Sequence, residues 1–235
     1  MNDENFWIRG GVAQPFVKVG DSLKKKIPLP PLEIQEQIVA ELDGYQKIID
    51  GAKQIVSSYN PTIKVYPDWK HIKLEELTLS LTPPKKIQKN KYQVIGKYPI
   101  IDQSQKEIAG FTDDKATLVD VGQGVVIFGD HTCSIKYSET PFAQGADGIK
   151  ILATKKICLP KYLFYFLKTN PVETEGYKRH FGKLKSISIS VPPVETQKQI
   201  VAKIEEEQKM IEANKGLVKI FEQKIKDKIS EIWGE

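Results

Sequence analysis

The chain has 235 residues, of which 28% are charged and 40% apolar, a composition typical of a folded domain with extensions rather than of a disordered protein. No apolar run approaches the roughly 20 residues of a membrane span, and the first ten residues lack the apolar core of a signal peptide, so no membrane association is expected. Two cysteines, Cys133 and Cys158, provide no disulfide framework, so a reducing cytoplasm is the expected location.

Positive charge is concentrated in the middle of the chain. Residues 60–190 contain 20 Lys and Arg against 13 Asp and Glu, whereas the remainder contains 15 against 17, within a net charge of +5. This distribution favours a nucleic-acid-binding middle held between protein-binding ends. A lysine-rich solvated surface would account for the charge equally well.

Residues 1–26 form a lead-in that is too short to fold alone. They pass from strand-like to basic residues just before a proline pair, and residues 175–188 approach a second proline pair in a similar way. We therefore expect residues 1–26 to be the remnant tail of a first domain.

A long repeat follows the lead-in. Residues 27–56 return as residues 189–218 with no gap, and 14 of the 30 aligned positions are identical. Each copy opens with Pro-Pro and a glutamate, which suits the first turn of a helix. We predict one helical segment over residues 27–59 and a second over residues 189–235.

Both copies have apolar residues at heptad spacing. A seam two columns wide needs a partner, so the two helices are predicted to pair as an antiparallel coiled coil, with residues 42, 49 and 56 facing residues 204, 211 and 218. The alternative is two ordinary amphipathic helices packed on a globular core. The predicted seam residues are Ile38, Leu42, Ile49, Val56, Ile204, Ile211, Val218 and Ile225.

Residues 60–188 have the pattern of a separate α+β domain. A strand is expected to begin at Trp69, a short helix at residues 74–81, and several β-rich runs between residues 92 and 152. Pro160 is expected to open a helix that faces the sheet with Leu163, Phe164 and Leu167, and Pro171 to end it. The predicted fold is therefore a β-rich globular α+β domain with a mostly antiparallel sheet, flanked by two long helices.

Four segments resemble the DNA specificity subunit of type I restriction-modification systems. LPPLEIQEQIVAEL and VPPVETQKQIVAKI are similar to the openings of its conserved helices, DWKHIKLEELT to the start of a target-recognition domain, and YLFYFL to the helix near that domain's end. The resemblance implies a complete target-recognition domain over residues 60–188 between two spacer helices. Since the body of a first recognition domain is absent, it implies a half-length form that pairs with a second copy.

The sequence offers no catalytic constellation. The Asn-Pro pairs at residues 60 and 170 are better interpreted as a turn and a helix stop, and Gly122-Gln-Gly124 lacks the remaining residues of a phosphate-binding loop. His131 and Cys133 lie close together, but no second ligand pair has the spacing of a zinc site. We therefore expect no enzyme activity, no cofactor and no metal.

Three loops carry amide, hydroxyl and cationic side chains, which are the groups that reach base edges and phosphates. They cover residues 103–106, residues 129–137, and the most basic segment at residues 177–185. The resemblance implies DNA contact at the same places. The predicted DNA-binding residues are Gln103, Ser104, Gln105, Lys106, His131, Thr132, Lys136, Tyr137, Tyr177, Lys178, Arg179, His180, Lys183 and Lys185.

Together these features predict a non-catalytic subunit that reads one half of a bipartite site in double-stranded DNA. By resemblance, its partners would be methyltransferase subunits, through them the restriction subunit, and a second copy of the chain. A coiled-coil adaptor that binds only proteins is the alternative, and a stand-alone enzyme is a second one. Loss of DNA affinity with salt would separate a DNA reader from an adaptor.

Overall fold

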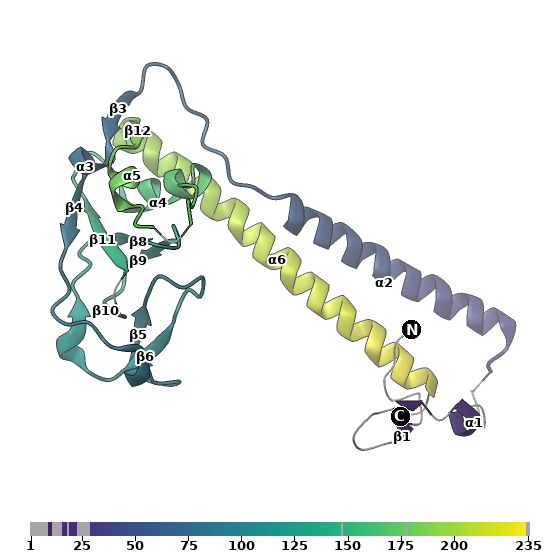
Figure 1. The fold of residues 1–235 in the computed structure, drawn as a ribbon. Helices are drawn as coiled ribbons and strands as arrows, with labels where there is room; N and C mark the ends of the chain where they lie inside the picture. Colours follow the sequence, from purple (N-terminus) through teal and green to yellow (C-terminus); the bar gives the residue numbers. More distant parts are fainter. Residues whose placement is uncertain are drawn as a thin grey trace. The chain divides into compact units, whose positions relative to one another are not determined.

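The computed structural model describes residues 9–10, 16–17, 19–22, 29–146, 148–176 and 178–233 (Figure 1). The chain divides into two units. Residues 1–58 and 211–235 form the helix-pair unit, and residues 59–210 form the globular unit. Most of the predicted remnant tail, residues 1–26, lies outside the described residues. Its described parts are strands β1 (Arg9–Gly10) and β2 (Phe16–Val17), which pair antiparallel, and helix α1 (Val19–Ser22).

The repeated segments form the two long helices, α2 (Leu32–Ser58) and α6 (Val194–Trp233). Each helix begins directly after its proline pair. The carbonyl of Pro31 accepts the N–H of Gln35 at 3.1 Å, and the carbonyl of Pro193 accepts the N–H of Gln197 at 3.0 Å. Proline suits this place because its missing N–H would have no partner there. No helix in the described part of the chain is long and apolar enough to cross a membrane.

In the helix-pair unit, α2 and the C-terminal half of α6 lie side by side and antiparallel (Figure 1). Glu41 pairs with Lys228 at 3.2 Å and Lys53 pairs with Glu222 at 2.8 Å. Residue numbers therefore rise along α2 where they fall along α6, as in an antiparallel pair. The rings of Tyr45 and Phe221 pack at 5.4 Å between centroids. The predicted antiparallel pairing of the two helices is therefore observed.

The heptad position of a residue in α2, and not its hydrophobicity, decides how deeply its side chain is buried. Ile49 and Ala52 are only 2% and 4% exposed, whereas the neighbouring Ile48 and Ile55 are 38% and 51% exposed. The remaining seam residues of the helix-pair unit are partly buried: Ile38, Leu42, Val56, Ile211, Val218 and Ile225. A narrow seam of this kind stabilises a helix pair and leaves the other faces open.

Ile204 departs from the predicted seam. It is 2% exposed and belongs, with Val201, to the main hydrophobic core of the globular unit. The prediction for Ile204 was wrong because the globular core occupies the first turns of α6, and the seam begins only after them.

The globular unit contains two four-stranded sheets, with strand orders β4-β11-β8-β9 and β6-β5-β10-β7, and a two-stranded ribbon of β12 and β3. Pairing is antiparallel throughout the described strands except between β5 and β10. The strands are β3 (Lys70–Lys73), β4 (Thr78–Leu81), β5 (Tyr98–Ile101), β6 (Gly110–Thr112), β7 (Leu118–Val119), β8 (Val125–Gly129), β9 (Ile135–Ser138), β10 (Phe142–Gln144), β11 (Ile149–Thr154) and β12 (Ser188–Val191).

Helix α4 (Pro160–Thr169) covers the core of the first sheet. Tyr162, Leu163 and Leu167 are at most 1% exposed, and the Tyr162 hydroxyl donates to the carbonyl of Ser190 at 2.6 Å. Phe164 is only partly buried, and its ring packs against Tyr137 of strand β9 at 5.8 Å, so it lies toward the sheet as expected. Two short helices complete the unit, α3 (Leu74–Leu77) and α5 (Phe181–Lys185).

Two predicted element boundaries were wrong. Residues 74–81 form one helical turn followed by strand β4, because Thr78 begins the pairing with β11. Residues 189–191, expected at the start of the second helical segment, belong to strand β12, which pairs with β3. In both places the β-branched residues found a partner strand, which local periodicity does not reveal.

The contrast between neighbouring isoleucines gives a test of the seam. Replacing Ile49 with Ala should lower the free energy of unfolding of the helix pair by about 2–4 kcal/mol, because a fully buried side chain is lost. The control, Ile48→Ala, should change it by less than about 0.5 kcal/mol. Amide hydrogen exchange of α2 measures both effects. Equal effects would mean that the helix has no defined seam.

Candidate nucleic-acid interface

The first two predicted loops are joined through Gln103. Its main-chain carbonyl accepts hydrogen bonds from the hydroxyls of Thr132, at 2.6 Å, and Ser134, at 3.2 Å. Its side-chain oxygen accepts the N–H of His131 at 3.3 Å. Gln103 and Thr132, both predicted to contact DNA, therefore contribute to holding one loop against the other.

Asp130 joins the second loop to the third. Its carboxylate is 4% exposed and accepts the N–H groups of His180, at 3.0 Å, and Phe181, at 2.9 Å. The N–H of Asp130 donates to the carbonyl of Gly148 at 2.6 Å. Since a buried carboxylate needs such donors, Asp130 fixes the path of the third loop as it enters helix α5. The three loops thus form one continuous site, which we call the loop cluster.

His180 is part of the framework rather than of the surface. It is 3% exposed, and its Nε2 accepts the N–H of Glu175 at 2.9 Å. Nδ1 must then carry the proton, which it donates to the carbonyl of Asp130 at 3.1 Å. Both ring nitrogens are used inside the protein, so the predicted DNA contact of His180 was wrong.

Lys136 is a second internal support. It is 3% exposed, and its ammonium group donates to the carbonyls of Asp102, at 2.8 Å, and Lys106, at 2.5 Å. Burial lowers the pKa of this lysine. Its charge ties down both ends of the first loop, which corrects the prediction that it contacts DNA.

Tyr137 lies away from the loop cluster. Successive residues of a strand point to opposite faces, so Lys136 of strand β9 faces the loops and Tyr137 faces helix α4. The ring of Tyr137 packs against Phe164 at 5.8 Å, and Lys161 of α4 lies 5.7 Å above it. Burial raises the pKa of Tyr137 to about 12. Tyr137 therefore lies on the face of β9 opposite the loops, and its predicted DNA contact stays a prediction.

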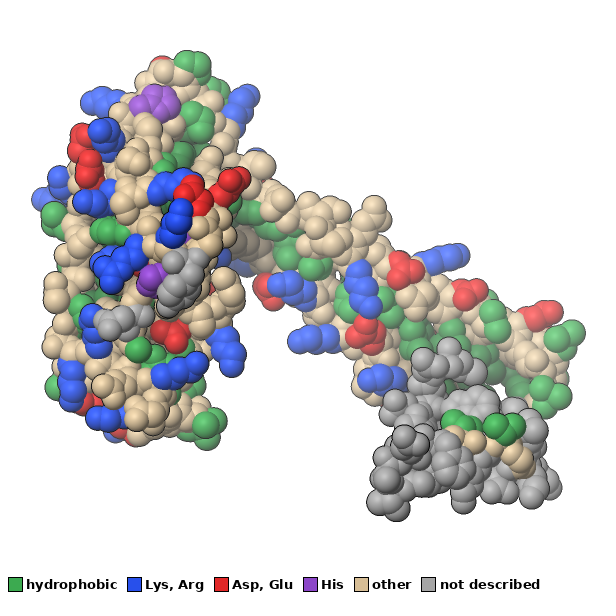
Figure 2. Space-filling model, viewed as in Figure 1, with side chains coloured by type: hydrophobic (Ala, Val, Ile, Leu, Met, Phe, Trp, Pro, Cys, Tyr) green, Lys and Arg blue, Asp and Glu red, His purple; other side chains and the backbone are tan. Residues whose placement is uncertain are grey.

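The outer surface of the loop cluster carries amide and cationic side chains. Gln105 and Lys106 are exposed in the first loop, and Lys178 and Arg179 in the third. Figure 2 shows Lys and Arg side chains distributed over this face of the globular unit. An amide and a guanidinium can pair with base edges, and lysine ammonium groups attract phosphates.

The other residues predicted to contact DNA differ in their ion-pair and hydrogen-bond partners. Lys183 is exposed and pairs with Glu175 at 2.8 Å, and Lys185 lies 3.8 Å from Glu75. The hydroxyl of Ser104 is buried and has no hydrogen-bond partner within the described residues, so this side chain points inward. Tyr177 lies outside the described residues.

A comparison with known families matches this architecture. The family model described as "Type I restriction modification DNA specificity domain" covers residues 66–222, about two thirds of the chain. The match spans both sheets, the loop cluster and nearly three quarters of α6.

The chain belongs to this family.

Solved structures show the same fold for the specificity domain and its helices. A chain from "Structural basis underlying complex assembly and conformational transition of the type I R-M system" is 17% identical, has a TM-score of 0.59, and is matched over 95% of this chain and 65% of its own length. The HsdS subunit from Thermoanaerobacter tengcongensis is 17% identical, with a TM-score of 0.50 and coverage of 95% and 64%. The type I restriction-modification system S subunit from M. genitalium is 10% identical, with a TM-score of 0.55 and coverage of 96% and 67%.

These TM-scores show a shared fold. The specificity-domain chain spans less than two thirds of the length of the first two matched structures. The sequence matches no curated protein.

Sequence reasoning did not identify Gly148, Lys150 or Phe181 as residues of the specificity domain's site. Gly148 has φ of +109°, a backbone conformation that favours glycine, and it lies beside the side-chain amide of Gln103. Lys150 lies 5.3 Å above the ring of Phe181, beside the third loop. The alternation of strand β11 could have placed Lys150 outward, but nothing local indicated its partner.

Asp130 gives a test of the loop cluster. Asp130→Ala should lower the free energy of unfolding by about 3 kcal/mol, because two main-chain N–H groups lose a charged acceptor. It should also increase protease cleavage within the third loop. The control is Asp120→Ala, whose exposed carboxylate accepts one bond from Gly122 at 3.1 Å and should cost less than about 1 kcal/mol. Thermal unfolding compares the two, and similar losses would remove Asp130 from its supporting role.

Proposed function

We propose that the chain is a non-catalytic DNA specificity subunit of a type I restriction-modification complex, and that its globular unit reads one half of a bipartite target. The observation that carries this proposal is the convergence of three separate segments into one loop cluster. Asp130, Gln103 and Lys136 hold the segments from beneath, and the exposed side chains face outward. A binding site on loops supported by a rigid sheet is the usual design for variable recognition.

The exposed groups have the chemistry for direct readout. Gln105 can bond adenine through both atoms of its amide, and Arg179 can bond guanine through its guanidinium. Lys106 and Lys178 would fix the register through phosphates, which carries no sequence information by itself. Since the framework is already hydrogen-bonded, little ordering of the backbone is needed on binding.

The helix pair would act as the spacer between two recognition domains. It would also bind methyltransferase subunits and, through them, the restriction subunit. In a homodimer both half-sites would be the same, so the target would be a palindrome interrupted by unread base pairs. Co-expression with a cognate methyltransferase, followed by mapping of methylated sites and light scattering, tests this arrangement. A complex without sequence preference would contradict it.

Salt dependence tests which groups contact DNA. Replacing Lys106 and Lys178 together with Ala in the full complex should reduce the slope of log affinity against log salt by about 2, because about 0.9 counterions are released per phosphate contact and both lysines are assigned to phosphates. Fluorescence anisotropy with a duplex containing the target, between about 50 and 200 mM salt, measures the slope.

The matched control is the double replacement of Lys155 and Lys156, which are equally exposed but lie in the turn after strand β11. This variant should keep the parent slope. If both double variants changed the slope equally, binding would be a general property of the basic surface. Salt-insensitive binding by the parent would favour a protein-binding adaptor.

A further inference from the structure

An apolar tip projects from the second four-stranded sheet of the globular unit. Residues 93–97 form a bend that leads into strand β5, and we call this bend the apolar tip. Val94 and Ile95, at its centre, are 90% and 86% exposed, the highest values among the large apolar side chains that the structure describes. The fold therefore gains almost no burial free energy from either side chain.

The backbone of the apolar tip is fixed against strand β6. Gln93 exchanges two main-chain hydrogen bonds with Phe111, each of 2.9 Å. The N–H of Lys97 donates to the carboxylate of Asp113 at 3.0 Å. Between them, Gly96 lies so close to the strand that a Cβ there would come within 2.9 Å of the Cβ of Phe111. Since valine and isoleucine are also stiff at χ1, two branched side chains are held outward on a rigid support.

Lysines surround the apolar tip, and the local sequence has no acidic residue to balance them. Residues 82–101 contain five lysines and no Asp or Glu. Lys89 and Lys91 belong to the 3-10 helix η1 (Lys89–Lys91) directly before the tip, and Lys97 ends the tip. All three are exposed, and none forms an ion pair within the described part of the chain.

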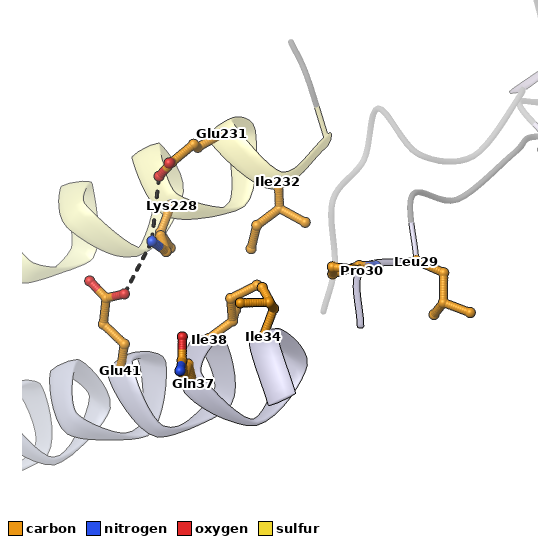
Figure 3. Close-up of a pocket in the computed structure, with 9 residues that line it drawn as sticks. All are labelled: Leu29, Pro30, Ile34, Gln37, Ile38, Glu41, Lys228, Glu231 and Ile232. Atoms are coloured by element: carbon orange, nitrogen blue, oxygen red, sulfur yellow. Dashed lines mark ion pairs between the residues drawn. The ribbon is translucent and has the colours of Figure 1, made fainter. Parts of the chain in front are cut away.

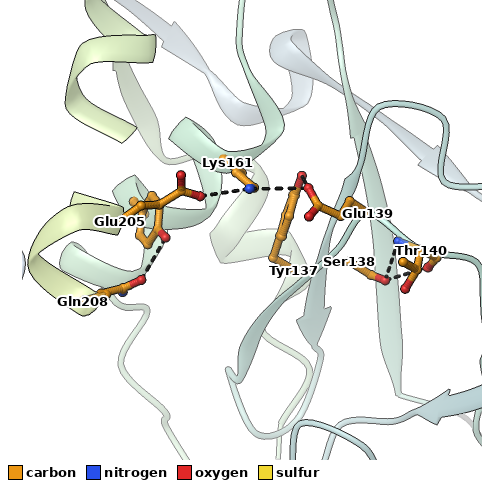
Figure 4. Close-up of polar contacts among 8 residues, drawn as sticks. Tyr137, Ser138, Glu139, Thr140, Lys161, Glu205 and Gln208 are labelled. Carbon is orange, nitrogen blue, oxygen red and sulfur yellow. Dashed lines mark hydrogen bonds and ion pairs between the residues drawn. The ribbon is translucent and has the colours of Figure 1, made fainter. Parts of the chain in front are cut away.

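Several lysines elsewhere in the globular unit are paired with carboxylates. Lys161 of helix α4 lies between two of them, Glu205 at 2.8 Å and Glu139 at 3.4 Å (Figure 4). Lys183 pairs with Glu175 at 2.8 Å. The lysines around the apolar tip differ, because their charge is available to a partner outside the globular unit.

The helix-pair unit has a second exposed apolar surface, but its charges are different. Leu29, which is 81% exposed, lines an open groove there (Figure 3). Lys228 pairs in this groove with Glu41, at 3.2 Å, and Glu231, at 3.5 Å, so both signs of charge border it. Lysines alone border the apolar tip, which suits a polyanion with an apolar interior. Duplex DNA has this character, with phosphates outside and stacked bases inside.

Strand β5 joins the apolar tip to the first loop of the loop cluster. It spans four residues, Tyr98–Ile101, which is about 13 Å at roughly 3.3 Å per residue. Successive base pairs are about 3.4 Å apart along a duplex, so this length corresponds to about four base pairs. A tip at the other end of β5 can therefore reach the duplex about four base pairs from the bases that Gln105 would contact.

From its exposure, rigidity and charge, we propose that the apolar tip is a wedge that inserts Ile95, supported by Val94, between two base pairs from the minor groove of the target duplex. Lys89, Lys91 and Lys97 would hold the phosphates on either side. Apolar side chains that enter the minor groove in this way partly unstack one base step and kink the duplex. Because pyrimidine–purine steps unstack most easily, the wedge would favour such a step without a hydrogen bond to it. The inference rests on the proposed DNA recognition and adds a readout of DNA shape.

Unstacking at a single step is measured with 2-aminopurine, whose fluorescence rises when it leaves the base stack. The probe replaces successive bases of a target duplex identified by methylation mapping, in the complex of the full chain with a methyltransferase. We expect a rise at one step about four base pairs from the bases read by the loop cluster, and its loss when Val94→Ser and Ile95→Ser are combined. Methyltransferases extrude the base that they modify, so that base gives a separate signal, which should remain in the double variant.

Binding and stability separate the wedge from a general effect. The double variant should bind the duplex roughly 10-fold more weakly with an unchanged salt slope, since an apolar contact and no phosphate contact is lost. Its melting temperature should equal that of the parent, because both side chains are exposed. Lys89→Ala with Lys91→Ala should instead lower the slope by about 2. The matched control is Leu79→Ser, a 58% exposed apolar side chain on strand β4, which should leave fluorescence, affinity and slope unchanged.

The inference is overturned if the parent complex unstacks no step besides the modified base, or if the unstacking persists in the double variant. Weaker binding of the methyltransferase by the double variant, with unchanged DNA affinity of the assembled complex, would also overturn it and assign the tip to a protein contact. A parent without sequence preference in methylation mapping would contradict the proposed function itself. A sequence-specific parent without unstacking removes only the wedge.

Discussion

Helix α6 has to bury two different surfaces along its length, and much of the structure follows from this division. Its first turns place Val201 and Ile204 in the globular core, and its later turns place Val218 and Phe221 on the seam with α2. The heptad pattern alone cannot tell these two surfaces apart, because Ile204 and Val218 occupy the same heptad position. The buried amide of Gln197 marks the part that belongs to the globular unit.

The loop cluster shows a comparable division between support and contact. Lys136 and His180 have the chemistry of DNA-binding side chains. Both instead form hydrogen bonds with main-chain groups within the protein. Burying them costs desolvation free energy, which their hydrogen bonds offset. The same hydrogen bonds fix the geometry of the loops. The side chains left outside, such as Gln105 and Arg179, can then vary without altering the fold.

The repeat, the two helices and the β-rich middle could be predicted from the sequence because heptads and proline pairs are local signals. The order of strands could not, since β5 with β10 and β3 with β12 pair across long stretches of chain. Of the three predicted loops, residues 103–106 lie in a loop, whereas residues 135–137 belong to strand β9 and residues 181–185 form helix α5. Which of their side chains turn inward depends on strand alternation and on Asp130, whose two acceptor bonds reach 50 and 51 residues along the chain.

Site-specific photo-crosslinking from Arg179 tests the central claim most directly, that the loop cluster contacts the bases of the target. A crosslinking residue is placed at Arg179, and in a parallel sample at Lys156, in the complex of the full chain with a methyltransferase and target DNA. We expect a crosslink from position 179 to a defined base within one half-site and none from position 156. Crosslinks spread evenly along the duplex, or equal yields from the two positions, would contradict the account.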